Sequence, residues 1–482
     1  MSEIGVYSTA TQMLAALDAR TISSRELVEL HLDRIASIDG DLNAVPVPTA
    51  ERARAAASAA DEARSAGATG PLLGLPMTLK ESTRVAGLPQ SAGVPGLAEH
   101  VPDTDGPIAR AVLDAGACVL GKTNIPFALT DWQADSEVYG RTNNPWDLDR
   151  SPGGSTGGGG AALAAGMTPL EIGSDIGGSI RVPAAYCGVY GHRPSETAVP
   201  REGAFPMSDH HNPGVVMPVQ GPLARSADDL ELLFDVVAGP PTGEEGWRLH
   251  LPASRHDRIS DFRVAVMPLD LLTRPSDAMG GAVDELARFL GEAGATVSTA
   301  MPEIDVETYY HDYLTTLMLM TTRGMTAEAR EASAATMIDT GDPDAIARAR
   351  GLTLSGADYL AVLDRRERAR VEWAEFFRHW DVVICPTILG SAHPHQTGRF
   401  ESRTLDIDGR EVPYGDNVTF PMWAIFAGLP ATAFPAGPDS AGLPLGLQAM
   451  GPNLEDRTTL RFAQLLEREW RGFEPPPAFA VS

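Results

Sequence analysis

Lysine is almost absent from this chain. Only Lys80 and Lys122 are lysines among the 38 basic residues, and every other one is an arginine. Arginine keeps its proton in proteins, whereas a desolvated lysine can release its proton and act as a base. Codon bias would also leave a few lysines at arbitrary places. The count therefore draws attention to two positions without choosing between these explanations.

Cysteine and long apolar runs are scarce as well. Cys118, Cys187 and Cys385 form no CxxC pair, and their odd number argues against a disulfide framework. We expect buried structural thiols in a reducing cytoplasm. No run of 18 apolar residues is present, so we expect no membrane span. Residues 1–20 also lack the basic segment and apolar run of a secretory signal.

Positive charge is in deficit. The chain has 64 acidic and 38 basic residues, a net charge of −26. Such a chain repels nucleic acid and anionic membranes, so neither is expected as a partner. The 482 residues, 43% of them hydrophobic, can bury a large core, and a small-molecule substrate fits this composition. Assembly into a homo-oligomer is left open.

The apolar residues alternate between helical and strand periods along the chain. Helical periodicity covers residues 8–37 and is interrupted by a Ser-Ser-x-Glu cap, and LLGLPMTLKES predicts a strand that delivers Lys80. DVVICPT predicts a buried strand, PATAFPAG and LPLGLQAMGP predict paired strands, and residues 304–380 are mostly helical in pattern. No repeat or long linker divides the chain. We therefore predict one α/β domain over residues 1–482 with a helical elaboration at 304–380.

Two motifs match known sites only superficially. Residues 116–123, GACVLGKT, fit the phosphate-loop pattern, but Ala-Cys-Val-Leu belongs in a strand and Asn-Ile-Pro follows where a helix should begin. Residues 153–157, GGSTG, fit the nucleophile elbow of α/β-hydrolases, which needs a strand directly before it. The preceding NNPWDLDRSP contains two prolines and cannot be a central strand. His192, His210 and His311 could nominally complete such a triad, but no context selects one of them.

Metal-binding patterns are missing. The close histidine pairs, His210–His211 and His393-x-His395, lack the H-E-x-x-H spacing. Surface or loop roles account for them. We predict no metal and no cofactor.

Two glycine-rich stretches remain to be explained. SPGGSTGGGG, residues 151–160, holds six glycines and three hydroxyl side chains, too much glycine for a helix interior. It runs into GGAALAAGM, for which we predict a helix of small residues. In GSDIGGSIRVP, the backbone amides of Ile176, Gly177, Gly178 and Ser179 could converge on one oxygen, as an oxyanion hole requires. Ser179 would then be a nucleophile. It needs a base, and an unprotonated lysine could serve.

With these residues the sequence resembles the amidase signature enzymes. The resemblance centres on GGSTGGGGAALAAGMTPLEIGSDIGGSIRVPAAYCGVYGHRPS. Five shorter segments before and after it occur in the family's order: GLPMTLKES, LGKTN, VYGRTNNPWD, CPT and GLPLGLQAMGP. It implies a central mixed β-sheet surrounded by helices, with residues 66–200 as the signature core. It also implies a catalytic triad of Ser179 as nucleophile, Ser155 as bridging serine on a cis peptide bond, and Lys80 as base. Ser155 stands 24 residues before Ser179, as the family pattern requires.

The chain departs from the family pattern at several positions. Thr156 replaces a second serine but keeps a hydroxyl, and Arg193 replaces a lysine at a position that we interpret as structural. The resemblance gives Leu129 and Thr130, together with Ser155, substrate-binding roles. The segment FALTDWQADS around them differs from the commoner Met-Gly-Ser form, so the substrate is left open.

The resemblance predicts a serine amidohydrolase that cleaves carboxylic amides through an acyl-enzyme. Five aromatic residues of FALTDWQADS and YGDNVTFPMWAIFAG suit apolar or aryl amides if they line the pocket, but such residues also build cores: Phe127, Trp132, Phe420, Trp423 and Phe426. Esters and carbamates (urethanes) present similar carbonyl groups. One alternative is a glutamine-hydrolysing amidotransferase subunit. Another is a catalytically silent scaffold that binds a partner through residues 304–380.

Overall fold

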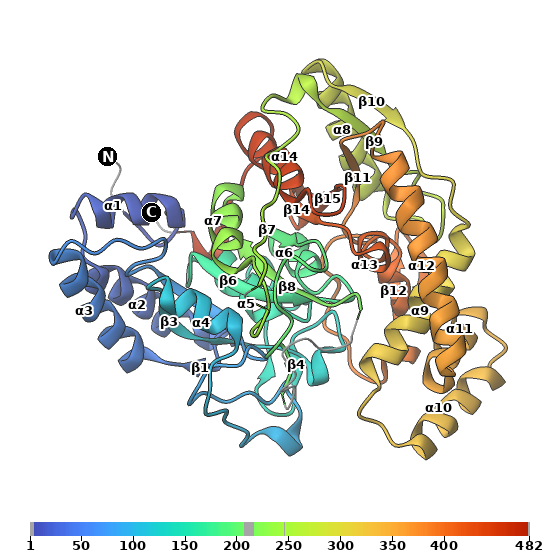
Figure 1. Cartoon of the computed structure of the whole chain (residues 1–482), viewed down its shortest axis with the longest axis horizontal. Helices are drawn as coiled ribbons and strands as arrows, with labels where there is room; N and C mark the ends of the chain where they lie inside the picture. Colours follow the sequence, from blue (N-terminus) through green and yellow to red (C-terminus); the bar gives the residue numbers. More distant parts are fainter. Residues whose placement is uncertain (1–3, 207–215, 245, 481–482) are drawn as a thin grey trace.

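The computed structural model describes residues 4–206, 216–244 and 246–480. One sheet of eleven strands forms its centre (Figure 1). In spatial order the strands are β1 (Val47–Pro48), β3 (Cys118–Thr123), β2 (Pro76–Lys80), β6 (Leu170–Asp175), β8 (Val219–Ala224), β7 (Tyr190–Arg193), β14 (Ala431–Pro438), β15 (Pro444–Met450), β11 (Val382–Pro386), β9 (Arg263–Val266) and β10 (Thr296–Thr299). Two further pairs of short strands are β4 (Asp135–Ser136) with β5 (Gly140–Arg141), and β12 (Thr404–Ile407) with β13 (Arg410–Pro413).

The sheet is mixed. β2 runs parallel to β3 and β6, and β9 runs parallel to β10 and β11, whereas the other neighbouring pairs are antiparallel. The strands expected from DVVICPT, PATAFPAG and LPLGLQAMGP are β11, β14 and β15, and the last two are paired. These features confirm the α/β class and the mixed sheet that the resemblance implies.

Helices surround the sheet. They are α1 (Ala10–Asp18), α2 (Ser24–Leu42), α3 (Ala50–Ser65), α4 (Pro107–Asp114), α5 (Gly157–Ala164), α6 (Arg181–Cys187), α7 (Ala227–Val237), α8 (Asp277–Glu292), α9 (Val306–Thr321), α10 (Ala327–Asp339), α11 (Pro343–Thr353), α12 (Gly356–Phe376), α13 (Met422–Ala427) and α14 (Asp456–Glu469). Ser23 and Glu26 form the capping box at the start of α2. Helices α9 to α12 lie together at one end of the molecule, in yellow and orange (Figure 1). Among the described residues, no helix is long and apolar enough to cross a membrane.

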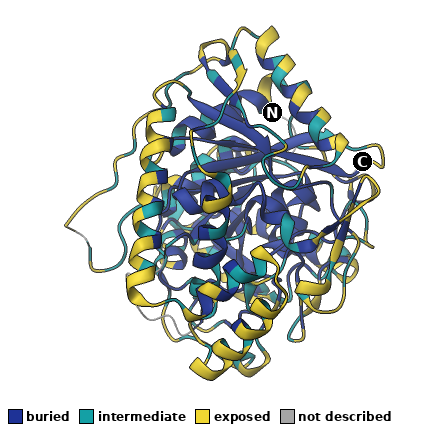
Figure 2. Ribbon diagram, turned by 90° about the vertical axis from the view of Figure 1, so that its right-hand side faces the viewer, coloured by how far each residue is buried: buried dark blue, intermediate teal, exposed yellow. Residues whose placement is uncertain are grey.

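Separate hydrophobic clusters cover the two faces of the sheet. Successive side chains of a strand point to opposite faces. On β11, Val382 and Ile384 belong to a cluster with α1, α4, α7, α8 and α14, while Val383 and Cys385 belong to one with α9, α12 and α13. Figure 2 shows the resulting layers, with buried strands inside and exposed residues on the outer surfaces of the helices. The sheet is therefore buried on both faces, which accounts for the continuous apolar run of DVVICPT.

The two glycine-containing patterns near the sheet fold differently from each other. The GACVLGKT segment contributes strand β3, as expected from its apolar residues, and not a phosphate loop. The helix expected over GGAALAAGM is α5, but the first part of the glycine run was predicted to be too rich in glycine for a helix, and this was wrong for Gly157 and Gly158, because α5 begins at Gly157. A Cβ atom at Gly158 would lie 2.7 Å from the carbonyl oxygen of Ala44 and 2.8 Å from that of Asn124. Close packing of α5 thus overrides the low helix propensity of glycine.

Alanine substitutions at two helical glycines should change stability in opposite directions. Gly158→Ala should lower the unfolding temperature and cost about 1–3 kcal/mol, because the new methyl group meets backbone atoms that cannot move aside. Gly281→Ala is the matched control in α8, where the position is exposed and no atom lies within 4 Å of the new Cβ. It should stabilise the protein by about 1 kcal/mol through helix propensity. Thermal unfolding followed by circular dichroism measures both, and equal shifts would contradict the packing argument.

Candidate active site

Three segments bring Lys80, Ser155 and Ser179 toward one edge of the sheet. Lys80 is the last residue of β2, and Ser179 lies in the turn between β6 and α6. Because β2 and β6 are parallel neighbours, their carboxyl ends meet at the same edge. Ser155 lies just before α5, and the Gly154–Ser155 peptide bond is cis, as the resemblance implies.

The amine of Lys80 is enclosed by hydroxyl groups. Lys80 Nζ donates to Ser155 Oγ at 2.7 Å and to Ser174 Oγ at 3.0 Å, and the Lys80 residue is only 1% exposed. Ser174 is the penultimate residue of β6 and was not among the predicted site residues. Its place five residues before Ser179, on the strand that leads into the glycine turn, was the available signal.

Burial brings the pKa of Lys80 close to neutrality. It lowers the pKa from 10.5 to about 7, although the carboxyl groups of Glu171, Asp175 and Glu81 act in the opposite direction. Glu171 is itself fully buried, and burial raises its pKa to about 8 in spite of hydrogen bonds from Thr78 and Thr123. A protonated Glu171 carries no charge that would stabilise an ammonium group. Lys80 can therefore be neutral near pH 7.

The backbones on either side of the two serines are joined directly. The Thr156 amide, next to Ser155, donates to the Ser179 carbonyl oxygen at 3.2 Å. Ser179 is 6% exposed, and its hydroxyl has no hydrogen-bond partner among the described residues. The structure thus joins Lys80 to Ser155 by a side-chain hydrogen bond, and Ser155 to Ser179 through the neighbouring backbone.

Of the four backbone amides expected to form an oxyanion hole, three are free to do so. The Gly178 amide donates to Asp175 Oδ1 at 3.0 Å and is therefore occupied. The amides of Ile176, Gly177 and Ser179 have no acceptor in the described part of the chain. A cluster of amide donors without acceptors is the arrangement that can stabilise a developing oxyanion.

Two buried arginines hold Asp175 at the base of this turn. Burial raises the pKa of Asp175, but Arg181 and Arg193 outweigh it and bring the pKa to about 2. Arg181 Nε donates to Asp175 Oδ2 at 3.0 Å. Arg193, which stands where the family has a lysine, donates to the carbonyl oxygens of Asp175 and Met217, both at 2.8 Å. Its contacts agree with the structural role expected for this position.

The segment around the expected substrate-binding residues borders Ser155. Leu129 is half-buried with φ +61°, and Thr130 is exposed. The next residues lie against the cis bond, because a Cβ at Gly154 would clash with the carbonyl oxygens of Asp131 and Gln133. Leu129 and Thr130 therefore directly precede residues that lie against the Gly154–Ser155 bond.

The five aromatic residues do not form one lining. Phe127 is 51% exposed. Trp132, Phe420, Trp423 and Phe426 are buried together in the cluster that contacts α9 and α12. Of these, Trp132 reaches the turn that carries Ser179, where its Nε1 donates to the Gly177 carbonyl oxygen at 2.8 Å.

Among the described residues, no histidine side chain is hydrogen-bonded to Lys80, Ser155 or Ser179. His192 is hydrogen-bonded to Thr432 and Asp456, and His311 is hydrogen-bonded to Asp344. His393 is bonded to Tyr414, and burial lowers its pKa to about 4. His210 and His211 lie outside the described residues. Within the described ranges, no group of three or more His, Cys, Asp or Glu side chains could hold a metal ion.

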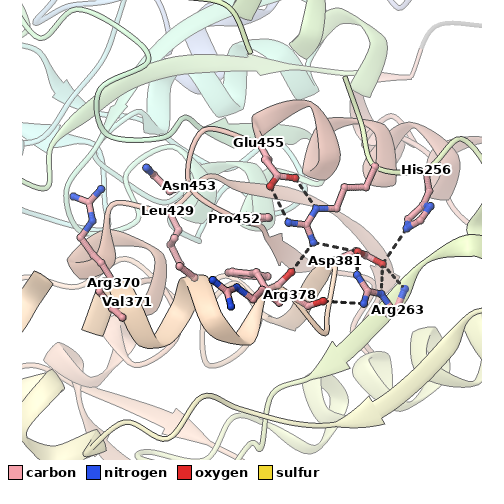
Figure 3. A pocket seen from close by; sticks show the side chains of 13 residues that line it. His256, Arg263, Arg370, Val371, Arg378, Asp381, Leu429, Pro452, Asn453 and Glu455 are labelled. Atoms are coloured by element: carbon pink, nitrogen blue, oxygen red, sulfur yellow. Dashed lines mark hydrogen bonds and ion pairs between the residues drawn. The ribbon is translucent and has the colours of Figure 1, made fainter. Parts of the chain in front are cut away.

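A cavity of about 790 Å³ lies apart from these residues (Figure 3). Arg255, Arg263 and His256 line it and bind the carboxylate of Asp381, and Arg255 also binds Glu455. None of the expected site residues lines this cavity. The arginines, the histidine and the two carboxylates just named form one ion-pair network.

Known proteins resemble the chain over nearly its whole length. The family model Amidase matches residues 26–460. The putative amidase AmiB2 of Mycobacterium tuberculosis is 32% identical over 97% of this chain and 98% of its own. A glutamyl-tRNA(Gln) amidotransferase subunit of a Synechococcus species is 31% identical over 96% and 97%, respectively.

A solved structure agrees with these sequence relatives. A bacterial aryl acylamidase of the amidase signature family superposes with a TM-score of 0.81 at 25% identity, covering 96% of each chain. The chain therefore belongs to the amidase signature family and is a hydrolase of carbon–nitrogen bonds.

Proposed function

We propose that the protein is a serine amidohydrolase in which Ser179 attacks the amide, Ser155 transfers the proton and Lys80 is the base. The observation that carries this proposal is the hydrogen bond of 2.7 Å between Lys80 Nζ and Ser155 Oγ at a lysine whose pKa is about 7. A neutral amine can accept a proton from a hydroxyl, whereas an ammonium group cannot.

The reaction would proceed in two halves. Ser155 passes a proton to Lys80 and takes one from Ser179, whose oxygen forms a bond to the carbonyl carbon of the amide. The resulting oxyanion accepts hydrogen bonds from the free amides of the turn. The relay then returns the proton to the leaving nitrogen as the C–N bond breaks, which releases the amine. Water attacks the acyl-enzyme along the same proton path and releases the carboxylic acid.

Apolar or aryl amides are the proposed substrates. The aromatic side chain of Trp132 at the turn and the likeness to an aryl acylamidase support this class. Esters and carbamates carry the same type of electrophilic carbonyl, so activity toward them is included. The second candidate is glutamine hydrolysis, which is favoured by the identity of 31% with an amidotransferase subunit. The net charge of −26 makes delivery of ammonia to charged tRNA less suitable.

A substrate panel tests the proposed class. The purified protein is assayed with anilides, primary amides, matching esters and carbamates, and glutamine. Hydrolysis of an anilide without ammonia release from glutamine supports the proposal. Efficient release of ammonia from glutamine alone would favour the amidotransferase function.

A serine-directed fluorophosphonate should modify Ser179. Its oxygen is the proposed nucleophile, and the amides beside it would stabilise the phosphonyl adduct. Peptide mapping after labelling identifies the modified residue, and Ser179→Ala should remove both label and turnover. A label on Ser155 would contradict the assignment, and an unlabelled, inactive protein would favour the scaffold.

Lys80→Arg should lower amide hydrolysis by about 10²–10⁴-fold, because a guanidinium group keeps its proton and cannot act as a base. The matching ester should lose less, since its leaving group needs less help from an acid. Both rates are measured on variants whose folding is checked by circular dichroism.

Lys122→Met is the matched control for this variant. Lys122 is the cross-strand partner of Leu79, the residue before Lys80. Because successive side chains of a strand alternate, the side chains of Lys122 and Lys80 lie on opposite faces of the sheet. It donates to the Pro89 carbonyl oxygen and is fully buried, which is why methionine replaces it here and not the larger arginine. Folded Lys122→Met should keep its activity. Near-wild-type amidase activity in Lys80→Arg would overturn the proposed base.

The rate should rise with pH around the pKa of Lys80. Protonated Lys80 cannot accept a proton, so kcat/KM for an uncharged amide should increase as pH rises through about 7 and then level off. Stopped assays across this range, with protein stability verified at each pH, give the profile. A rate that is constant or falls between about pH 6 and 8 would show that another group limits the reaction.

A further inference from the structure

Two aromatic side chains from other segments donate hydrogen bonds to the turn that carries Ser179. Tyr313, on helix α9, donates from its hydroxyl to the Ile176 carbonyl oxygen at 3.3 Å. Trp132 donates to the next carbonyl oxygen, that of Gly177, at 2.8 Å. Both donors come from segments distant in sequence from the turn.

A trans peptide unit is planar, and its carbonyl and N–H groups point in opposite directions. The unit joining Gly177 to Gly178 is fixed at both ends, because Trp132 binds its carbonyl and Asp175 accepts from its N–H at 3.0 Å. The unit joining Ile176 to Gly177 is fixed at its carbonyl by Tyr313. Its N–H, on the Gly177 nitrogen, is one of the three amides without an acceptor in the described part of the chain.

Steric contacts alone do not fix this second peptide unit. A Cβ atom built at Gly177 would have only one neighbour within 4 Å among the described residues, the Tyr313 hydroxyl oxygen at 3.9 Å. Glycine also permits backbone rotations that other residues resist. If the unit turned over, a carbonyl oxygen would replace a donor beside Ser179 and would repel a developing oxyanion.

We propose that Tyr313 is a positioning residue that keeps the Gly177 amide directed at the oxyanion. This inference rests on the proposed function of Ser179. Tyr313 is 0% exposed and belongs to the buried cluster beneath α9, so its hydroxyl is held in place by its ring. Helix α9 then contributes to transition-state stabilisation although Tyr313 itself does not touch the substrate.

Tyr313→Phe tests the inference, because it removes the hydroxyl and keeps the ring. Tyr309→Phe is the matched control one turn away, where a similarly buried hydroxyl donates to the Trp423 carbonyl oxygen at 2.7 Å. For each protein, kcat and KM are measured with the best amide substrate. Inhibition constants are measured for a trifluoromethyl ketone of the same shape, which forms a tetrahedral oxyanion adduct, and for an unreactive analogue.

Tyr313→Phe should lower kcat by about 10–100-fold, somewhat less than the loss of a whole oxyanion donor, with KM within about twofold. The inhibition constant of the ketone should rise by a similar factor, whereas that of the unreactive analogue should not change. The midpoint of the pH profile of kcat/KM should also stay the same. Tyr309→Phe should leave kcat and ketone binding unchanged even where it lowers the unfolding temperature. Equal kinetic effects of both variants, or a change in KM alone, would overturn the role of Tyr313.

The concentration of active sites is taken from end-point fluorophosphonate titration, so the comparison does not depend on the yield of folded protein. The same titration separates the two proposals. A wild-type protein that is not labelled at Ser179 refutes the proposed function. A wild-type protein that is labelled and active, with Tyr313→Phe indistinguishable from Tyr309→Phe, refutes only the positioning role.

Discussion

Desolvation of one amine is the constraint on which the rest of this site depends. Water stabilises an ammonium group strongly, and removing it from Lys80 moves the pKa down to about 7. Three carboxyl groups nearby oppose that shift, yet Glu171 is buried so deeply that its own pKa rises to about 8. Hydroxyl groups of Ser155 and Ser174 provide hydrogen bonds without adding negative charge. The amine of Lys80 therefore has hydrogen-bond partners, but these partners do not stabilise its protonated form over the neutral one.

The architecture around Lys80 follows from the need to exclude water. β2 lies inside the sheet between β3 and β6, so its last residue emerges among buried neighbours. The glycine-rich start of α5 allows backbone to approach the carbonyl oxygens of Ala44 and Asn124. Side chains at those positions would separate the layers. Glycines after Ser155 thus allow close packing between the start of α5 and the segment that follows β3.

From the sequence, local patterns indicated the segments that carry candidate site residues. The glycine pattern after one strand indicated Ser179 and its neighbouring amides, and the apolar pattern before Lys80 indicated the strand that ends there. The choice of Lys80 as base and of Ser155 as bridge came from the family resemblance, and these roles stay predictions. The helical state of Gly157 and Gly158 was not predictable, because it depends on contacts with residues far away in sequence. Tyr313 is 137 residues from Ile176, within a helix whose apolar pattern is typical of ordinary core packing. The occupation of the Gly178 amide likewise depends on the turn's three-dimensional shape.

The burial of Lys80 and Lys122 also determines the chemistry of the outer surface. Lys80 is 1% exposed and Lys122 is 0% exposed, and the chain has no other lysine, so every cationic side chain at the surface is a guanidinium or an imidazolium group. Guanidinium groups stay protonated and react poorly with acyl donors. Activated esters and other acylating compounds therefore find no lysine amine on the folded surface. A protein proposed to form acyl intermediates is in this way protected from acylation at lysines outside its own site.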